Sequence, residues 1–357
     1  MIILAIETSC DDTGIAIVDI DDNSIEILSN LVNTQTIHAN YGGVYPMKAK
    51  EEHIKNIHGV YEEAFREAEN PIIEAIAVTV GPGLEPSLWV GIKFAEELSQ
   101  KLDIPIIPVN HMEGHLLSSL LPVYELNKKI SFREMPERAI SLLVSGGHTQ
   151  IIKVESLKLK VESKNTYEIL GTTLDDAVGE AFDKVARMLD LTYPGGPAIS
   201  KLAEKARKEN LKNEVIVFPR PMLHSKDYDF SYSGLKTAVL YHIQNLEKKH
   251  SGILQNVGIK ESIAKEFEDA AIEVIIKKTV RAIKETGSTH LLLGGGVAAN
   301  KYLQNELERV SKENNFTVYY PVKEITGDNA LMIAIAGYLN KDKETREPQK
   351  ATGSLKL

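Results

Sequence analysis

A chain of 357 residues is too long for one simple core and fits two domains of about 150 to 200 residues each. Hydrophobic residues make up 43% of the chain and charged residues 25%, which is typical of a soluble globular protein that folds by itself. The net charge of −9 at pH 7 means that the average surface does not attract a polyanion. A nucleic acid would therefore have to meet a local basic patch or a basic partner subunit.

The single cysteine and the first residues point to a reducing compartment. Cys10 has no second cysteine with which to form an internal disulfide. The opening sequence MIILAIETSC lacks the basic start and the long apolar middle of a signal peptide. No apolar run reaches the roughly 18 residues that a membrane span needs. We therefore expect a cytoplasmic protein that does not enter a membrane.

The first half of the chain alternates between apolar strands and amphipathic helices. Two apolar runs separated by a polar turn read as a hairpin, and the later order of strand, helix, strand and helix indicates a parallel crossover. From 121 to 138 the sequence loses periodicity and gains charge and proline, which marks a connection between halves. The predicted strands cover residues 2–7, 15–20, 25–32, 76–80 and 104–109, and the predicted helices cover 48–68 and 88–102.

The second half restarts with the same hairpin, which predicts two similar lobes facing each other across a cleft. We accordingly divide the chain into an N-terminal lobe (1–136), a C-terminal lobe (137–340) and a polar tail (341–357), which is expected to fray. The predicted strands of this half cover residues 139–144, 149–155, 290–293 and 316–320, and the predicted helices cover 175–189, 198–208, 235–248, 260–285, 300–312 and 328–339.

Two histidines, His111 and His115, follow the strand at 104–109 at helical spacing. On a helix both imidazoles project from one face about one turn apart, close enough to hold one cation. A third ligand must come from elsewhere, because a catalytic metal usually takes about three protein ligands. In the zinc-protease pattern a glutamate directly follows the first histidine, but here Met112 stands at that place and Glu113 lies further round the helix. The pair thus suggests a metal and argues against that protease.

Three glycine turns follow apolar strands, at residues 81–83, 145–147 and 294–296. Glycine lets backbone N–H groups approach anionic oxygens without an intervening Cβ, so these turns favour a phosphate-bearing ligand. Each turn alone is explained equally well by strand-ending geometry, but three of them raise the expectation of a ligand. Asn300 follows the third turn near a helix start, where its amide could read an adenine or ribose edge.

Several acidic residues allow either a structural or a functional interpretation. Glu7, Asp11 and Asp12 lie in and after the first strand. Asp183 lies on a helical face that could equally be a solvated surface. Asp328 follows Gly327 and precedes an apolar helix, so it is interpreted first as a helix N-cap, with a carboxylate ligand for a metal as the alternative.

Eight motifs follow one another along the chain: ETSCDDTG (7–14), HMEGH (111–115), VSGGHTQ (144–150), GEAFDK (179–184), YPGGP (193–197), FPRP (218–221), SGLKT (233–237) and DN (328–329). Taken together, they resemble the bacterial form of the TsaD family, the tRNA threonylcarbamoyladenosine transferases. The resemblance spans about residues 2 to 340 and keeps the order of the motifs. Two positions depart from it: Glu85-Pro86 follows the turn at 81–83 where similar members often have small apolar residues, and Leu331 stands where alanine is common.

The resemblance implies an α/β protein of the actin-like ATPase fold (ASKHA), with two similar lobes around a nucleotide-binding cleft. It implies one divalent metal ion, iron in preference to zinc, held by His111, His115 and Asp328. It also implies a set of residues that contact the adenylate substrate. These are Val144, Ser145, Gly146, Gly147, His148, Asp183, Gly196 and Asn300.

The implied reaction transfers a threonylcarbamoyl group from threonylcarbamoyl-AMP to N6 of the adenosine just 3′ of the anticodon, in tRNAs that read codons beginning with A. A mixed anhydride already has a good leaving group, so the protein mainly positions two substrates and stabilises charge. An aromatic amine is a poor nucleophile, so a general base would help, and Asp11 is the candidate.

The resemblance implies tRNA, a paralogous TsaB-like subunit and a small TsaE-like ATPase as partners. Three alternatives stay open. An ATP-dependent small-molecule kinase of the same fold would have a similar cleft and similar glycine turns but would not need the histidine pair. A metalloprotease would use the histidine pair, and a scaffold protein would retain the cleft without catalysis.

Overall fold

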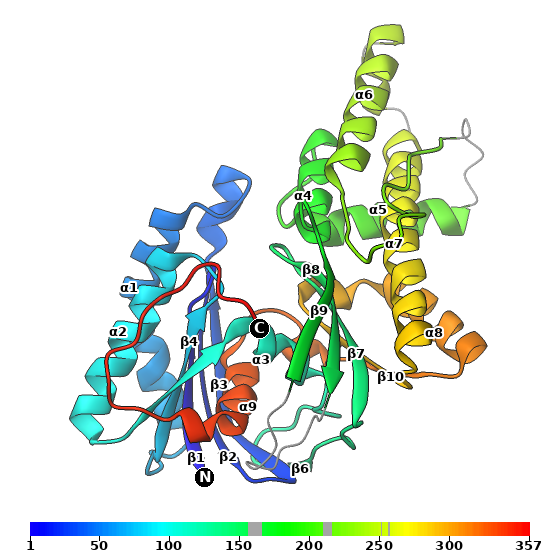
Figure 1. Ribbon diagram of the computed structural model, residues 1–357. Helices are drawn as coiled ribbons and strands as arrows, with labels where there is room; N and C mark the ends of the chain where they lie inside the picture. Colours follow the sequence, from blue (N-terminus) through cyan, green and yellow to red (C-terminus); the bar gives the residue numbers. More distant parts are fainter. Residues whose placement is uncertain (156–165, 210–215, 251, 256–257) are drawn as a thin grey trace. The chain divides into compact units, whose positions relative to one another are not determined.

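The chain folds into two α/β units (Figure 1). The computed structural model describes residues 1–155, 166–209, 216–250, 252–255 and 258–357. Unit 1 contains Met1–Arg138, Val154–Tyr167 and Tyr319–Leu357, and unit 2 contains Ala139–Lys153 and Glu168–Val318. This division follows packing, because the end of the chain returns to unit 1. The division drawn from the sequence followed chain order and grouped residues up to 340 with the second lobe.

Unit 1 is built on a six-stranded sheet with the order β5-β4-β1-β2-β3-β6. The first three strands form an antiparallel meander because short turns join them, whereas β4 and β5 pair in parallel with β1 and β4 through helical connections. The strands are β1 (Ile2–Glu7), β2 (Asp12–Ile20), β3 (Ser24–Thr34), β4 (Ala75–Gly81), β5 (Ile106–Asn110) and β6 (Lys129–Ser131).

Helices cover both faces of this sheet. Alternation along β4 shows it: Ile76 and Val78 join the core cluster under α1 and α2, while Ala77 contacts Gly337 of α9 on the other face. Helix α9 is apolar on all sides because it lies between the sheet and α3. The helices are η1 (Thr36–Tyr41), α1 (Pro46–Glu67), α2 (Glu85–Leu102), α3 (His111–Ser118), η4 (Lys323–Ile325), α9 (Ala330–Leu339) and η5 (Lys341–Lys343).

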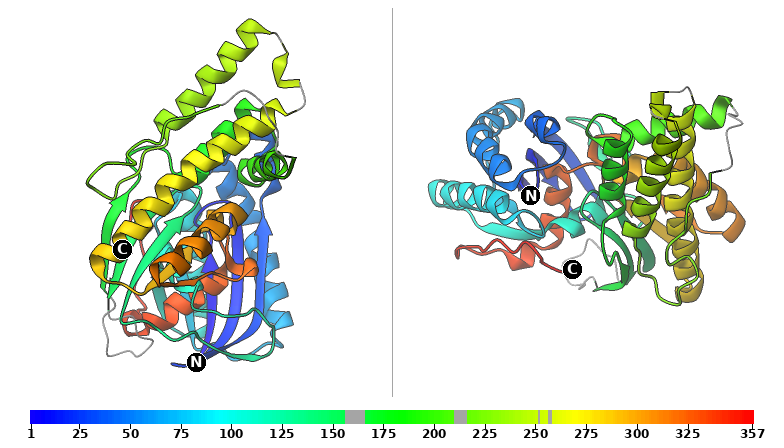
Figure 2. Two further views of the ribbon diagram at one scale, coloured as in Figure 1. Left: turned by 90° about the vertical axis from the view of Figure 1, so that its right-hand side faces the viewer. Right: turned by 90° about the horizontal axis from the view of Figure 1, so that it is seen from above.

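Unit 2 has a five-stranded sheet with the order β11-β10-β7-β8-β9, in which β10 pairs in parallel with β7. Its strands are β7 (Arg138–Val144), β8 (Thr149–Glu155), β9 (Thr166–Thr172), β10 (His290–Gly294) and β11 (Thr317–Tyr319). The longest helix, α7, packs beside α5 (yellow and green in Figure 2). The helices are α4 (Val178–Met188), α5 (Gly195–Glu209), α6 (Ser233–Lys249), η2 (Ile253–Gln255), α7 (Ile259–Thr286), η3 (Gly296–Ala299) and α8 (Lys301–Asn314).

Both units open with a β-hairpin, as the sequence predicted, and each long predicted helix is present within a few residues of its expected bounds. Strands β6 and β9 were missed because they are short or poorly buried and carry little periodic signal. None of the helices in the described ranges has the length and apolarity needed to cross a membrane. The cleft between the two lobes stays a prediction.

The polar tail does not fray, contrary to expectation. It runs along the edge of unit 1, where Thr345 pairs with Ile106 through two backbone hydrogen bonds of 2.8 Å. Further on, the Thr352 N–H donates to the carbonyl of Val80 at 2.9 Å. The tail is held by backbone hydrogen bonds to an edge strand and not by burial of apolar side chains, so its sequence needs no hydrophobic period. Figure 1 shows it in red, ending near α3.

Candidate active site

Helix α3 begins immediately after β5 and carries both histidines of the predicted metal site. The side chain of Asn110 caps the helix by accepting a hydrogen bond from the N–H of Met112 at 2.9 Å. The helical spacing places the two imidazoles side by side, with ring centroids 4.6 Å apart. Every residue of α3 is buried, so the packing around the helix fixes the direction of both rings.

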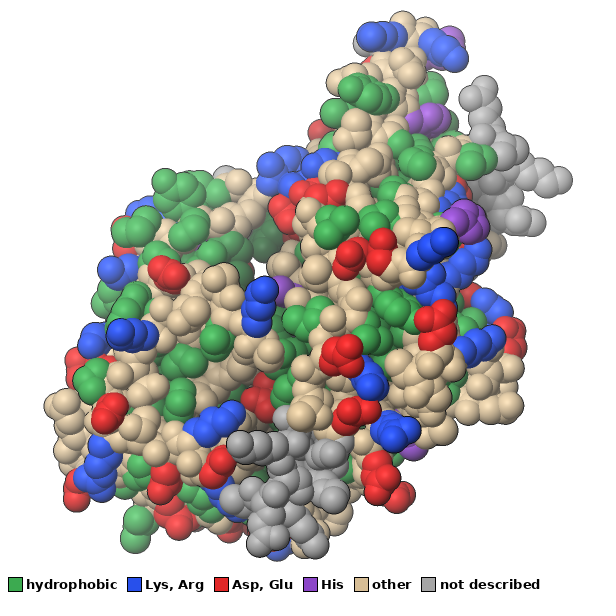
Figure 3. All heavy atoms as spheres, viewed as in Figure 1, with side chains coloured by type: hydrophobic (Ala, Val, Ile, Leu, Met, Phe, Trp, Pro, Cys, Tyr) green, Lys and Arg blue, Asp and Glu red, His purple; other side chains and the backbone are tan. Residues whose placement is uncertain are grey.

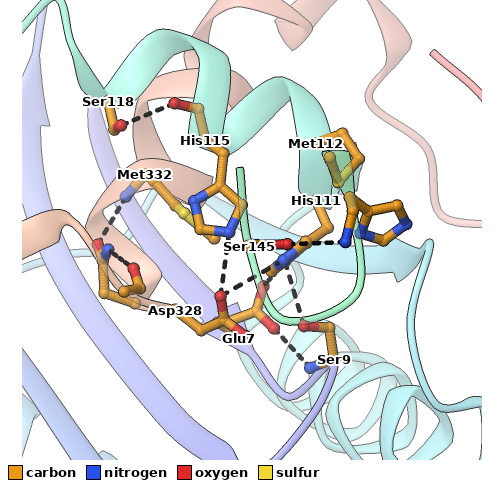
Figure 4. A network of polar contacts seen from close by, with 12 residues as sticks. Glu7, Ser9, His111, Met112, His115, Ser118, Ser145, Asp328 and Met332 are labelled. Carbon is orange, nitrogen blue, oxygen red and sulfur yellow. Dashed lines mark hydrogen bonds and ion pairs between the residues drawn. The ribbon is translucent and has the colours of Figure 1, made fainter. Parts of the chain in front are cut away.

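Asp328 reaches the same place from the far end of the sequence. Its Oδ1 lies 3.0 Å from Nε2 of His115 and 3.5 Å from Nε2 of His111 (Figure 4). The interpretation of Asp328 as the N-cap of α9 is wrong. The cap is Asn329, whose side chain accepts from the N–H of Met332 at 3.0 Å, and the neighbouring carboxylate of Asp328 faces the histidines instead.

The donor set of this site fits a divalent cation. One ligand atom from each of His111, His115 and Asp328 lies within 4.8 Å of the other two. Two imidazoles and one carboxylate form a donor set that suits iron and zinc, and three protein ligands leave positions for water or substrate. The charge of Asp328 also raises the pKa values of Asp11 and Asp12, in addition to the larger effect of burial. The surroundings are therefore electronegative, which favours a bound cation.

Glu7 was not assigned to the site from the sequence, yet its side chain contacts His111, one of the three predicted metal ligands. Its Oε2 lies 3.1 Å from Nδ1 of His111 and accepts from the Thr79 hydroxyl at 2.6 Å. Burial alone would raise the pKa of Glu7, but the charge and hydrogen bond of His111 outweigh it and lower that pKa. Conversely, burial alone would lower the pKa of His111, but the carboxylates of Glu7 and Asp328 raise it to about 9. The sequence signal was a charged residue ending an otherwise apolar strand.

Asp11, the candidate general base, lies in the turn between β1 and β2. Its backbone carbonyl accepts from the N–H of Gln35 at 3.1 Å, which ties the turn to the end of β3. Burial raises the pKa of the Asp11 carboxyl, and the charge of Asp328 raises it further, while the hydrogen bond with Cys10 opposes both. A carboxylate with a raised pKa is a better proton acceptor, so the environment suits a base.

Glu113 lies between the two histidines in sequence but is held elsewhere. It accepts from the amide of Asn340 and from the hydroxyl of Tyr167, each at 2.8 Å. Both of its oxygens therefore have protein partners. This agrees with the expectation that Glu113 is not aimed at a metal-bound water.

Unit 2 contains a cavity of about 660 Å³, large enough for a nucleotide. Four residues from the predicted substrate-binding set line it: Gly146, Asp183, Gly196 and Asn300. Of the remaining four predicted residues, Val144 ends strand β7, and Ser145, Gly147 and His148 form the loop around Gly146. That loop is closed by a hydrogen bond of 2.8 Å from the Ser145 N–H to the His148 carbonyl.

Asp183 holds the first residue of α5. Its Oδ1 accepts from the N–H of Gly195 at 2.7 Å, and burial raises the pKa of its carboxyl. A Cβ on Gly195 would lie 2.4 Å from Cβ of Ala186, so only glycine permits this approach of α5 to α4. Gly196, the next residue, has open space around it on the cavity side.

Asn300 has protein partners for its whole side-chain amide. Its Oδ1 caps α8 by accepting from Leu303, and its Nδ2 donates to Oγ of Ser200 at 3.0 Å and to Oε1 of Glu268 at 2.8 Å. The structure thus gives Asn300 a clear role in joining α5, α7 and α8. Direct reading of an adenine edge by this amide stays a prediction.

Sequence reasoning missed several cavity residues, among them a linked group of three: Arg207, Glu268 and Tyr302. Glu268 is fully buried and accepts from Arg207 at 2.6 Å, and the Arg207 guanidinium lies 3.6 Å from the centroid of the Tyr302 ring. The available signal was a glutamate on the apolar face of α7, because a charge on a buried helix face requires partners.

The glycine turns differ in what they face. In the turn at 81–83 the Gly83 N–H donates to the carbonyl of Gly353 at 3.2 Å, and a Cβ on Gly81 would strike the Thr352 carbonyl. The tail therefore occupies this turn, and we assign no ligand to it. The other two turns lie against each other, since a Cβ on Gly295 would be 2.4 Å from the Val144 carbonyl oxygen.

Relatives of known name match nearly the whole chain. A family model described as tRNA N6-adenosine threonylcarbamoyltransferase matches residues 26–335. A protein of that name from Polynucleobacter necessarius subsp. necessarius (strain STIR1) is 43% identical over 349 residues, which cover 95% of this chain and 92% of the relative. One from Thermosipho africanus (strain TCF52B) is 45% identical over 341 residues, which cover 95% of this chain and 94% of the relative.

Among solved structures, full-length HypF in its phosphate- and nucleotide-bound form matches with a TM-score of 0.57 and 15% identity. The match covers 95% of this chain, which spans about half of the HypF chain (55%). A likeness at this identity shows the fold alone. Together with the two hairpin-led α/β units, it confirms the actin-like ATPase fold. The match of the family model and the identity to full-length relatives place the chain in a family: it belongs to the TsaD family of tRNA N6-adenosine threonylcarbamoyltransferases.

Proposed function

We propose that this protein transfers a threonylcarbamoyl group from threonylcarbamoyl-AMP to N6 of the adenosine just 3′ of the anticodon, in tRNAs that read codons beginning with A. The observation that carries the proposal is the identity of 43 to 45% to transferases of that name over 95% of the chain. The protein is accordingly an acyl-transferring enzyme that modifies tRNA.

The cavity of unit 2 is the proposed place of the adenylate. Its volume of about 660 Å³ suits an AMP moiety, and its walls combine glycines and apolar side chains with charged, hydroxyl and amide side chains. The predicted substrate-binding residues are proposed to act here: Val144, Ser145, Gly146, Gly147, His148, Asp183, Gly196 and Asn300. Two exposed lysines of the lining, Lys201 and Lys301, add positive charge for a phosphate.

In the transfer, the N6 nitrogen forms a bond to the carbamoyl carbon while the bond from that carbon to the phosphate oxygen breaks. AMP leaves with the electron pair, and the N6 proton passes to a base. Asp11 is proposed as that base, because burial raises the pKa of its carboxyl and so strengthens it as a proton acceptor. Holding two substrates in register supplies much of the rate in such a reaction.

His111, His115 and Asp328 are proposed to hold one divalent metal ion, Fe²⁺ in preference to Zn²⁺, because two histidines and one carboxylate form the set typical of non-haem iron. When bound, the ion would supply Lewis acidity toward oxygen atoms of the substrate. The chain itself contributes the fixed direction of the imidazoles through the buried helix α3.

Partners are proposed from the family resemblance: tRNA, a paralogous TsaB-like subunit and a TsaE-like ATPase, acting in the cytoplasm. An exposed apolar face on α1 and α2 supports a protein partner. Met47 and Ile54 are 53% and 55% exposed, and Trp89 lines a groove of about 290 Å³ between the two helices. Hydrophobic side chains gather over η1 and the start of α1 at the upper left of Figure 3. Such a patch is costly to leave in water.

The test is reconstitution of the reaction. The protein, its proposed partners and the adenylate-forming enzyme are incubated with tRNA, ATP, threonine and bicarbonate, and the modified nucleoside is measured by mass spectrometry. We expect the nucleoside with the wild type and its loss with the His111→Ala/His115→Ala double variant. Full turnover by a double variant that has lost its metal would favour the kinase alternative, and chelator-sensitive cleavage of a generic protein would favour the protease.

A further inference from the structure

A fully buried carboxylate stands directly behind the proposed metal ligands without belonging to them. Glu7 ends β1 with no exposed surface, and its Oε2 lies 3.1 Å from Nδ1 of His111 (Figure 4). A buried carboxylate is costly unless every lone pair finds a donor. A buried carboxylate at this position therefore calls for a functional explanation, and its contact with the His111 ring suggests one.

The two nitrogens of the His111 ring face different groups. Nε2 faces Oδ1 of Asp328 at 3.5 Å, whereas Nδ1 faces Glu7 and, also at 3.1 Å, the hydroxyl of Ser9. A carboxylate only accepts, so the hydrogen of the neutral ring must stand on Nδ1 when the ring binds Glu7. The lone pair is then on Nε2, the atom that faces the other ligands.

Glu7 is itself held rigidly. The hydroxyl of Thr79 on β4 donates to Oε2 at 2.6 Å, and the N–H of Ser9 donates to Oε1. The carboxylate thus connects two neighbouring strands of the sheet to helix α3. Because a donor on β4 and a donor in the turn after β1 fix the carboxylate, it cannot rotate away from the ring, and the ring direction follows from the sheet.

The second histidine lacks such support. Nδ1 of His115 is buried and has no hydrogen-bond partner within the part of the chain that the structure describes. On its Nδ1 side the His115 ring is therefore held by packing alone, while the Nδ1 side of the His111 ring also contacts an anionic acceptor.

We propose that Glu7 is a positioning residue of the metal centre, acting through His111 by fixing its Nδ1–H tautomer and so presenting the Nε2 lone pair to the ion. The inference rests on the proposed metal ligands and does not depend on the tRNA chemistry. Glu7 makes no direct contact with the ion. It sets how tightly the ion is held.

The test compares two glutamine variants of buried glutamates, Glu7→Gln and Glu113→Gln. A glutamine at position 7 can donate to Nδ1, which moves the ring hydrogen to Nε2 and blocks the ligand lone pair. Glu113 lies on α3 itself, is similarly buried and is bound to Asn340 and Tyr167 instead of a histidine. It controls for loss of a buried charge next to the ligands.

Each full-length protein is stripped with a chelator and titrated with Co²⁺ and, without oxygen, with Fe²⁺. Affinity is measured by calorimetry, and the cobalt d–d absorption reports the ligand set. We expect Glu7→Gln to bind about 10- to 100-fold more weakly than the wild type, with an altered cobalt spectrum. We expect Glu113→Gln to bind within about 3-fold of the wild type.

Wild-type affinity in Glu7→Gln, or an equal loss in both variants, would overturn the inference. A wild type that binds neither ion refutes the metal site, and the inference with it, while leaving the transfer reaction to its own assay. Should Glu7→Gln fail to fold, ¹⁵N-histidine NMR of the stripped wild type decides, with His111 assigned from the spectrum of His111→Asn. When the pH of the sample is raised until the His111 ring is neutral, its hydrogen should stand on Nδ1. An Nε2–H tautomer would contradict the proposal.

Discussion

Asn110 and Lys356 stand 246 positions apart in the chain and are joined by a hydrogen bond of 3.1 Å from Nδ2 of Asn110 to the backbone carbonyl of Lys356. The other end of the same amide caps α3, since Oδ1 accepts from Met112. One side chain therefore links the last residues of the chain to the helix that carries the histidine pair. The tail is a structural part of unit 1.

Deleting residues 345–357 should destabilise unit 1. The deletion removes the two hydrogen bonds between Ile106 and Thr345, and those from Thr352 to Val80, from Gly83 to Gly353 and from Asn110 to Lys356. At about 0.5 to 1.5 kcal/mol net for each of these bonds, we expect a loss of about 2.5 to 7.5 kcal/mol in the free energy of unfolding, measured with urea. The control is Arg346→Ala, which removes an exposed ion pair with Asp103 and should cost less than about 1 kcal/mol. A deletion with the wild-type midpoint would contradict the structural role of the tail.

Two neighbouring glycines should separate stability from binding. Gly195→Ala places a Cβ 2.4 Å from Cβ of Ala186 and 2.8 Å from Cα of Asp183, so the start of α5 must shift, at a cost of about 1 to 3 kcal/mol. Gly196→Ala meets open space and should leave stability within about 0.5 kcal/mol, but its methyl group intrudes on the cavity.

Unfolding midpoints and calorimetric titration with AMP check this pair. Gly196→Ala should bind AMP more weakly at unchanged stability. Gly195→Ala should show both a lower unfolding midpoint and a lower affinity for AMP. Wild-type AMP affinity in Gly196→Ala would show that the nucleotide does not bind beside this residue.

The buried carboxylate of Glu268 should be the most sensitive position in unit 2. Glu268→Ala leaves the Arg207 guanidinium with Asp269 as its remaining acidic partner and removes the acceptor of the Ser200 and Asn300 side chains. Breaking a buried ion pair in this way costs about 3 to 5 kcal/mol, which chemical denaturation can measure. Glu308→Ala, which breaks an exposed pair on α8, is the matched control and should change stability by less than about 1 kcal/mol. Equal effects of the two substitutions would rule out the network.

Asp12 should make the stability of the stripped protein depend on pH. Burial, assisted by the charge of Asp328, raises the pKa of its carboxyl from 3.8 to about 7, and its Oδ1 is buried without a partner in the described structure. The folded state thus binds this proton more tightly than the unfolded state does. The stabilisation is fully present below about pH 4 and is lost as the pH rises through about 7.

The variant Asp12→Asn has no carboxyl group to ionise at this position, so it should not lose stability as the pH rises through about 7. We expect it to be more stable than the wild type at pH 8 by about 1 to 3 kcal/mol, and the difference should shrink toward pH 4. Urea unfolding of both stripped proteins between pH 4 and 8 tests the slope. A difference that does not vary with pH would mean that Asp12 titrates as an ordinary surface carboxylate.

Local periodicity in the sequence was sufficient for the long helices, for most of the strands and for the histidine pair. The spacing of His111 and His115 places both on one helix face whatever surrounds the helix. The hairpin at the start of each half, the long helices and the glycine turns likewise follow from short-range patterns, because backbone hydrogen bonding and alternation act over a few residues. These features indicated two similar α/β lobes before any contact was known, and the resemblance of the motifs to the TsaD family implied the actin-like ATPase fold.

Tertiary structure alone decided which distant residues meet. Asp328 joins the histidines because α9 packs against α3 and because Asn329, not Asp328, caps its helix. Glu7 meets His111 because β1, β4 and β5 pair in parallel and bring their ends together. The tail is ordered because an edge strand offers it backbone partners, although its own sequence has no period. Each of these contacts depends on packing between segments far apart in the chain, and a one-dimensional pattern carries no record of that packing.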